Sequence, residues 1–262
     1  MTLSFSSSTA LITGASSGLG AEFARVLAGR GADLVLVARR RERMDALADA
    51  VRRAHGVHVR VHTADLSDPS SWDGVKAYTD AEGLSISTLI NNAGFATYGP
   101  LVEARARRTD DQVQVNVAAL TALTRLYLPD LVARGGGALV NVASTAAFQP
   151  VPSMAVYGAT KAYVKSFTAA LAWETRGSGL RVTALCPGAT KTEFFDVVGT
   201  EDAKVGNYET PEQVVATAMR ALDSRRTPPV VVSGANNRLG AFVGRLAPLR
   251  LSLPLTASLM GR

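Results

Sequence analysis

The 262-residue sequence has little of several features that define other classes of protein. It contains one cysteine, Cys186, which excludes a disulfide framework and any zinc site built from cysteines. No run of about 18 uncharged apolar residues appears, so no transmembrane helix is predicted. The N-terminus lacks a basic stretch followed by an apolar core, which argues against a signal peptide and predicts a cytoplasmic protein.

The composition also excludes disorder and a nucleic-acid partner. Apolar residues make up 47% of the chain, which is too high a fraction for a disordered protein. The net charge is +6, but the basic residues are scattered and no aromatic residues interleave with them, so we expect no nucleic-acid binding. The three histidines lack metal-ligand spacing, and no metal site is predicted.

Strand-like and helix-like segments alternate along the chain. Short apolar runs predict strands, and longer segments with apolar residues at helical spacing predict helices. The strands are expected at 9–13, 32–38, 57–62, 87–91, 137–142, 180–185 and 230–232, and the helices at 18–30, 40–54, 69–81, 110–133, 154–176 and 211–223. This alternation predicts an α/β, doubly wound parallel sheet with helices on both faces, in a single domain over residues 1–235.

A glycine-rich turn follows the first predicted strand. Gly14 allows a sharp turn, Gly18 lets a pyrophosphate approach the backbone, and Gly20 allows close packing of the next helix on the strand. The N-terminus of that helix offers free N–H groups to phosphates. No lysine follows the last glycine, so the turn is not a P-loop. We therefore predict a dinucleotide site, to which Ser16, Ser17 and Leu19 also contribute.

The end of the second predicted strand bears on which dinucleotide binds. An acidic residue that would hold the adenosine ribose is absent after Ala38, and Arg39 and Arg40 follow instead. Because guanidinium groups suit a ribose 2′-phosphate, we expect NADP(H) to be preferred over NAD(H). The alternative is a solvated basic turn. Asp65 and Leu66, after the third strand, are expected beside the adenine, although Asp65 also suits a loop or a helix cap.

Tyr157 and Lys161 lie one turn apart on the long helix predicted over residues 154–176. A free phenol has a pKa near 10 and is a poor acid–base group at neutral pH. We expect the lysine charge, together with an oxidised nicotinamide, to lower the pKa of Tyr157 by about two to three, which corresponds to roughly 3–4 kcal/mol of stabilisation of the phenolate. That would bring the phenol into the range for general acid–base catalysis. Taken alone, the pair is a weak signal and is more typical of a helix surface.

Further polar residues are predicted at the carboxyl edge of the sheet, where ligands bind in such folds. Ser144 ends the strand at 137–142, where its hydroxyl would donate to a substrate carbonyl oxygen. Asn116 lies in an apolar stretch of the helix at 110–133 and must find polar partners if it is buried. The remaining residues expected at this edge follow two other strands and are Asn92, Ala93, Gly94, Pro187, Gly188, Thr190 and Thr192.

Together, the motifs from Thr13–Gly20 to Pro187–Gly188 make the chain resemble the short-chain dehydrogenase/reductase family, in its compact branch, over about residues 8–234. The resemblance implies a Rossmann-type sheet of about seven strands and hydride transfer between nicotinamide C4 and a carbonyl or carbinol carbon. It implies that Ser144 positions the carbonyl oxygen, that Tyr157 exchanges its proton, and that Lys161 binds the nicotinamide ribose. It also implies that Asn116 supports a water chain to Lys161, and that two long helices build a homodimer or homotetramer.

The predicted rim of the cleft is mostly apolar. The residues expected to contact substrate are Phe95, Phe148, Met154, Phe194 and Phe195. No arginine in these rim segments is placed to bind a carboxylate, so we expect a neutral, apolar ketone, aldehyde or secondary alcohol. The segment 189–208 is predicted to be a mobile cover. Alternative functions are an NAD-linked hydroxyl dehydrogenase, a non-catalytic nucleotide-sensing module, and a dehydratase or epimerase.

The C-terminal tail, residues 236–262, combines apolar residues with arginines. Leu239, Phe242, Val243 and Leu246 have helical spacing, and Pro248 and Pro254 are expected to break the run. The tail is expected to pack on a neighbouring subunit, to cap the substrate cleft, or to make weak contact with a membrane surface.

Overall fold

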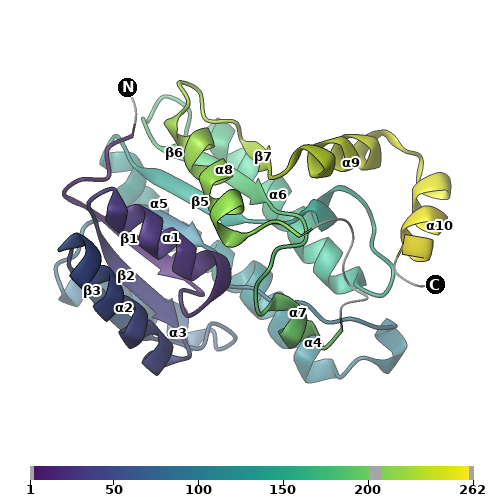
Figure 1. Cartoon of the computed structure of the whole chain (residues 1–262), viewed down its shortest axis with the longest axis horizontal. Coiled ribbons are helices and arrows are strands. Elements are labelled where there is room, and N and C mark those ends of the chain that lie inside the picture. Colours follow the sequence, from purple (N-terminus) through teal and green to yellow (C-terminus); the bar gives the residue numbers. More distant parts are fainter. Residues whose placement is uncertain (1–2, 201–207, 260–262) are drawn as a thin grey trace.

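The structure is a computed structural model that describes residues 3–200 and 208–259. Seven parallel strands form one sheet in the order β3-β2-β1-β4-β5-β6-β7 (Figure 1). The strands are β1 (Ser8–Thr13), β2 (Ala32–Ala38), β3 (Val59–Thr63), β4 (Ile86–Asn91), β5 (Ala138–Val142), β6 (Arg181–Cys186) and β7 (Val230–Val232). The strand order reverses between β1 and β4, and ligands bind at such a switch point in doubly wound sheets. The predicted doubly wound, Rossmann-type fold is therefore confirmed.

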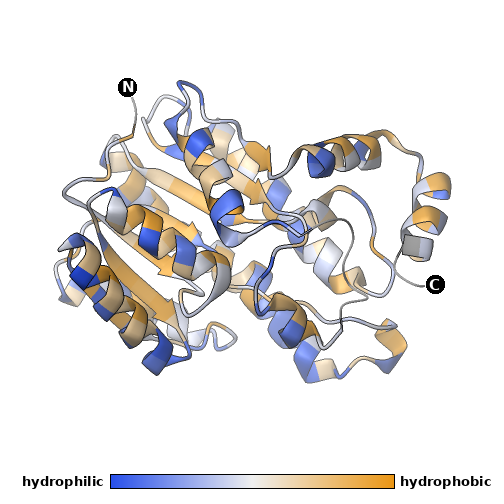
Figure 2. Cartoon of the chain, in the orientation of Figure 1, coloured by the Kyte–Doolittle hydropathy of each residue, from blue (hydrophilic) through white to orange (hydrophobic). Residues whose placement is uncertain are grey.

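Helices cover both faces of this sheet, which places a hydrophobic core on each side. One face carries α1 (Gly18–Gly29), α2 (Arg41–His55) and α8 (Pro211–Asp223), and the other carries α3 (Ser70–Ala81), α5 (Leu120–Ala133) and α6 (Ala155–Glu174). Leu34 and Leu36 of β2 belong to the first core, whereas Val35 and Val37 belong to the second. Successive strand residues point to opposite faces, so a strand buried on both sides needs an uninterrupted apolar run. Figure 2 shows the central strands of the sheet as mostly hydrophobic.

The long helix predicted at 110–133 has a more complex form. It begins earlier, as α4 (Ala106–Val113), passes through a π-helical turn, η2 (Gln114–Ala119), and continues as α5. Short 3₁₀ turns, η1 (Leu101–Glu103) and η3 (Thr145–Phe148), follow β4 and β5. A π turn widens the helix by one residue and is common at functional sites, and here it contains Asn116.

Two segments outside the sheet differ from the prediction. Within the expected cover at 189–208, a short helix α7 (Phe194–Val198) forms, and residues 201–207 lie outside the described part of the chain. The tail forms α9 (Ala235–Leu246) and α10 (Leu249–Leu259), which extend beyond the sheet in Figure 1. The expected break at Pro254 is wrong, because α10 continues through this residue. The carbonyl that loses its intrahelical partner belongs to Arg250, which is exposed, so water can hydrate it.

Among residues 3–200 and 208–259, no helix is long and apolar enough to cross a bilayer.

Candidate active site

A cleft of about 1380 Å³ opens at the carboxyl ends of the central strands. The glycine turn after β1 lines one end of the cleft, and the ends of β4, β5 and β6 line its floor. Residues of α9 and α10 line the opposite end. The cleft therefore joins the predicted nucleotide-binding residues to the predicted catalytic residues.

The glycine turn has the geometry that its sequence predicts. Gly14 and Gly18 have φ values of 65° and 54°, which favour glycine. A Cβ on Gly20 would lie 2.6 Å from Asn92 Nδ2, so this position leaves no room for a side chain. The three glycines thus allow the turn and the close packing of α1 against it.

Thr13 and Asn92 fix the turn in place. The Asn92 side chain donates to the Thr13 carbonyl oxygen at 2.9 Å, and Thr13 Oγ1 accepts from the backbone N–H groups of Asn92 and Ala93 at 3.0 Å each. Asn92 was predicted as a cofactor residue, whereas the role of Thr13 was missed. Its signal was a hydroxyl residue that ends the first strand immediately before the glycines.

The start of α1 is suited to a phosphate group. In the part of the chain that is described, no side chain caps this helix, although Ser17 occupies the N-cap position, and its first turn contains no acidic residue. The first N–H groups of a helix have no intrahelical partner, and they carry a partial positive charge. An uncapped N-terminus beside a glycine turn therefore fits the pyrophosphate of a dinucleotide.

The predicted adenosine end of the site holds two arginines. Arg40 Nε donates to Ser16 Oγ at 3.2 Å, and its Nη2 donates to Ser17 Oγ at 2.8 Å. Arg39 Nη1 lies 4.0 Å from Asp65 Oδ2. Asp65 also accepts from the backbone and side chain of Ser67, as expected of the loop role that the sequence left open. The cleft lining includes Arg39, Arg40, Asp65 and Leu66.

Tyr157 and Ser144 meet at the floor of the cleft. Both residues are buried, and the Ser144 hydroxyl lies close enough to the phenol to influence its pKa. Burial raises the pKa of Tyr157 to about 12, although the Ser144 hydroxyl acts to lower it. In the protein alone, the loss of hydration therefore outweighs the favourable contacts. The lowering predicted for the complex with an oxidised nicotinamide stays a prediction.

Lys161 is buried below the phenol. Its Nζ donates to the Val142 carbonyl oxygen at 2.8 Å and lies 5.8 Å from the centre of the Tyr157 ring. Burial lowers the pKa of Lys161 to about 8, so close to neutral pH the ammonium holds its proton only weakly. The lysine and the tyrosine share the site as predicted, but each is more easily neutral than in water.

Asn116 ties the π turn to the loop after β4. Its Oδ1 accepts from the Phe95 N–H at 3.1 Å, and its Nδ2 donates to the Phe95 carbonyl oxygen at 3.0 Å and to Thr160 Oγ1 at 3.1 Å. A Cβ on Gly94 would lie 3.0 Å from Asn116 Oδ1 and 3.2 Å from Lys161 Nζ. Gly94 therefore allows the amide and the ammonium to approach the same point. The water chain implied by the resemblance stays a prediction.

Most of the predicted residues line the cleft, with three exceptions. Gly20 and Asn116 lie behind the surface and support it, as described above. Phe148 is not among the residues that line the cleft, and its predicted substrate contact is not supported. The η3 turn directs Phe148 into a separate cavity under α9, where Lys165 Nζ lies 4.2 Å from the centre of its ring. The predicted residues that do line the cleft on the substrate side are Phe95, Met154, Phe194 and Phe195.

The cleft wall also contains residues that the sequence analysis missed. Arg108 of α4 lines the cleft and lies over the Phe95 ring, with its guanidinium carbon 4.2 Å from the ring centre. The prediction considered only segments that follow strands, so it missed an arginine supplied by a helix. The tail, for which capping of the cleft was one of the expected roles, contributes four large apolar side chains to the lining, namely Leu239, Val243, Leu251 and Leu255.

Comparison with known proteins defines the class to which this fold and site belong. The sequence model of the short chain dehydrogenase family matches residues 8–203. The chain is therefore a member of the short-chain dehydrogenase/reductase family, whose proteins are oxidoreductases that bind a nicotinamide cofactor. The family resemblance predicted from the motifs is confirmed.

Individual relatives show what the chain is similar to. It is 38% identical over 188 residues to sulfoacetaldehyde reductase 2 of Chromohalobacter salexigens, which covers 70% of this chain and 73% of that protein. A short-chain dehydrogenase from Sphingobium yanoikuyae in complex with NADPH superposes with a TM-score of 0.81 at 37% identity, covering 95% of each chain. A bulky-bulky ketone specific alcohol dehydrogenase from Comamonas testosteroni has a TM-score of 0.75 at 31% identity, covering 97% of this chain and 92% of that one.

Proposed function

We propose that this protein is an NADP(H)-dependent oxidoreductase that interconverts an apolar ketone or aldehyde and the corresponding alcohol. The observation that carries the proposal is the buried pair of Ser144 and Tyr157, with Lys161 buried beside it, in a cleft that begins at a dinucleotide-type glycine turn. A nicotinamide dinucleotide, when bound, supplies or accepts the hydride at the substrate carbon.

Tyr157 and Ser144 act on the substrate oxygen in this proposal. With a pKa of about 12, the phenol is protonated at neutral pH and is ready to donate to the oxygen of a carbonyl that is being reduced. Ser144 donates a second hydrogen bond to the same oxygen and stabilises the charge that develops there. In the reverse direction the phenol must lose its proton first, and a charged Lys161 favours that loss.

Three observations support NADP(H) over NAD(H). The second strand ends at Ala38 without an acid that would hold the ribose hydroxyls, and Arg39 and Arg40 line that end of the cleft. Guanidinium groups bind phosphate oxygens well. The Sphingobium yanoikuyae relative is a complex with NADPH. The residues that would hold the remainder of the dinucleotide are the glycine turn with Ser16, Ser17 and Leu19, then Asn92, Ala93, Gly94, Pro187, Gly188, Thr190 and Thr192.

The lining supports a bulky, largely apolar substrate. Phe194 lies beside the catalytic tyrosine, with ring centres 5.6 Å apart, and Phe195 packs against Phe194 with ring centres 5.4 Å apart. The apolar side chains of α9 and α10 continue this wall, as the capping role that the sequence analysis left open for the tail would require. Arg108 adds one cation to the wall, so a polar group remote from the carbonyl is also compatible with the site. Assembly as a homodimer or homotetramer stays a prediction.

A carbonyl panel with a matched pair of variants tests the proposal. The protein is mixed with NADPH or NADH and with ketones and aldehydes of increasing bulk, and the loss of reduced-nicotinamide absorbance is followed. Tyr157→Phe should lower turnover by about 10²- to 10⁴-fold while leaving dinucleotide affinity unchanged. Tyr163→Phe, on the exposed side of the same helix, should leave turnover unchanged.

The possible outcomes separate the candidate functions. Turnover with NADH alone would favour the NAD-linked dehydrogenase. Dinucleotide binding without turnover of any carbonyl or alcohol would favour the nucleotide-sensing module. Full turnover by Tyr157→Phe would overturn the assignment of this residue as the general acid.

A further inference from the structure

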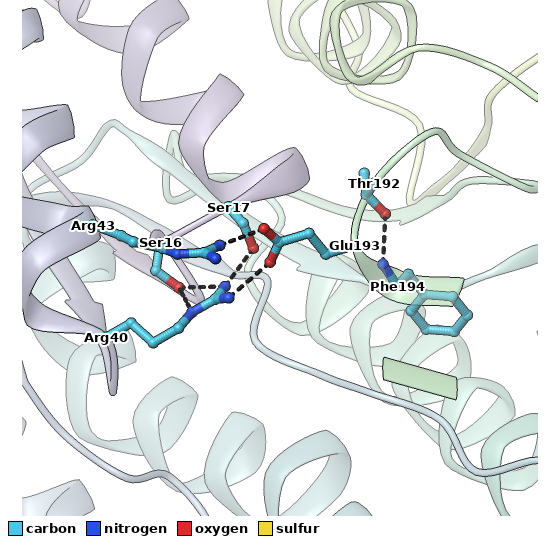
Figure 3. Close-up of polar contacts among 7 residues, drawn as sticks. All are labelled: Ser16, Ser17, Arg40, Arg43, Thr192, Glu193 and Phe194. Atoms are coloured by element: carbon cyan, nitrogen blue, oxygen red, sulfur yellow. Dashed lines mark hydrogen bonds and ion pairs between the residues drawn. The ribbon is translucent and has the colours of Figure 1, made fainter. Parts of the chain in front are cut away.

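Glu193 joins two parts of the cleft that are far apart in the sequence. It lies in the segment between β6 and α7, on the substrate side, yet its carboxylate contacts the arginines at the start of α2 (Figure 3). Arg40 Nη1 donates to Glu193 Oε2 at 2.7 Å, and Arg43 Nη1 donates to Oε1. Both carboxylate oxygens are therefore paired with guanidinium groups.

The same segment lies against the glycine turn. A Cβ on Gly18 would be 3.0 Å from Thr192 Cγ2, so the threonine methyl group covers the point where a pyrophosphate would approach the backbone. Thr192 Oγ1 accepts from the Phe194 N–H at 3.2 Å, and Phe194 packs against Tyr157. Residues 192–194 thus link the nucleotide end of the cleft to the catalytic tyrosine, and we call them the strap.

The charge pattern shows that Glu193 fills an anion site. Arg39 pairs with Asp65, which follows the neighbouring strand β3, and Arg41 pairs with Asp45 on its own helix. By contrast, the acid that pairs with Arg40 and Arg43 is supplied by the strap, about 150 residues away in the sequence. These hydrogen bonds hold the pKa of Glu193 below its usual value, so the carboxylate is charged at neutral pH.

A ribose 2′-phosphate would compete for the same cations. It carries more negative charge than a carboxylate and offers three oxygens to guanidinium donors. Arg40 also donates to Ser16 and Ser17 of the glycine turn, so its position is fixed at the adenosine end of the cleft. A carboxylate and a phosphate that both need Arg40 would also repel each other.

We propose that Glu193 is a specificity-determining residue that acts as an internal competitor of the 2′-phosphate. NADP(H) binds by displacing the Glu193 carboxylate from Arg40 and Arg43, which frees the strap, whereas NAD(H) leaves these ion pairs intact. The preference of this chain for NADP(H) is then smaller than its arginines alone would provide. The inference rests on the proposed use of NADP(H).

The test uses Glu193→Gln, which keeps the size of the side chain and removes its charge. Dissociation constants for NADPH and NADH are measured by nucleotide fluorescence with the full chain. The NADPH constant should fall between about twofold and about thirtyfold, the range for two exposed ion pairs, and the NADH constant should change by less than about twofold. The effect should shrink as salt is raised, because the groups involved are partly exposed.

Glu82→Gln is the matched control. Glu82 forms an ion pair with Arg60 at 3.1 Å, and the two side chains are 40% and 47% exposed. Glu193 and Arg40 are 38% and 44% exposed. Because Glu82 is not part of the cleft lining, its substitution should leave both dissociation constants unchanged.

Hydrogen exchange supplies a readout that does not depend on turnover. In the wild type, NADPH should increase exchange in a peptide containing residues 192–196, and NADH should not. Weaker NADPH binding by Glu193→Gln would show that the ion pairs hold the dinucleotide in place, and it would overturn the proposal. Unchanged NADPH binding would overturn it as well. Failure of the wild type to bind NADPH would instead contradict the proposed function.

Discussion

Lys161→Met gives the sharpest test of how burial sets the charges in this site. The Lys161 side chain is almost inaccessible, and burial lowers its pKa from 10.5 to about 8. A shift of this size corresponds to about 3 kcal/mol of destabilisation of the charged form relative to the unfolded chain. Methionine fills a similar volume without a charge, so it removes this pH-dependent contribution.

The sign of the effect follows from proton binding in the two states. Between pH about 8 and pH about 10.5, the unfolded chain keeps its lysine protonated while the folded protein does not. The unfolded state therefore binds more protons, and the free energy of unfolding rises with pH across this window. Lys161 destabilises the folded protein less as the pH rises. Between about pH 7 and about pH 9.5, the free energy of unfolding of the wild type should therefore increase by about 1–2 kcal/mol relative to that of Lys161→Met.

Urea unfolding followed by tryptophan fluorescence measures this contribution. Trp72 and Trp173 are present in both proteins, so the same signal reports on each. The difference in unfolding free energy between the wild type and Lys161→Met is taken at each pH. Groups whose shifted pKa does not depend on Lys161, such as Tyr127, cancel in this difference. A difference that stays constant with pH would refute the depressed pKa of Lys161.

Three further predictions concern individual positions in the cleft. Gly94→Ala should lower turnover by about tenfold or more in a steady-state assay, because the new Cβ would displace Asn116 and Lys161 by close contact. An unchanged rate would show that these neighbours can move freely. Arg39→Asp should shift the ratio of the NADPH and NADH dissociation constants toward NADH, and an unaltered ratio would exclude Arg39 from phosphate binding. Leu251→Asn should raise the KM of a bulky apolar substrate about tenfold, since Leu251 lines the cleft. Leu246→Asn should not, because Leu246 is equally exposed but lies outside the lining; equal effects would refute a substrate role for α10.

The order of elements and the type of fold were predictable from the sequence. Apolar runs such as Leu34–Ala38 identify strands that are buried on both faces, and their alternation with helices predicts a parallel sheet. The spacing of Gly14, Gly18 and Gly20 specifies a local turn whose geometry depends on few neighbours. Ser144 and Tyr157 come together because strand ends and helix starts meet at one edge of such a sheet.

Other features depend on the tertiary structure. The pKa of Tyr157 rises because surrounding elements exclude water, and sequence spacing carries no measure of that exclusion. Phe148 turns away from the cleft because the 3₁₀ turn after β5 directs it toward α6 and α9. The π turn at Asn116 is stabilised by bonds to residues on other elements, so helical periodicity did not reveal it.

The sequence by itself determined the sheet, the glycine turn and the set of polar residues at its carboxyl edge, because each is encoded by a local pattern of residue size and polarity. The tertiary structure alone decided which charges from distant parts of the chain meet. Glu193 and Arg43 are 150 residues apart, and their pairing exists because the segment after β6 folds back onto the start of α2. Such contacts depend on how packed elements are placed relative to one another, and no local pattern specifies that placement.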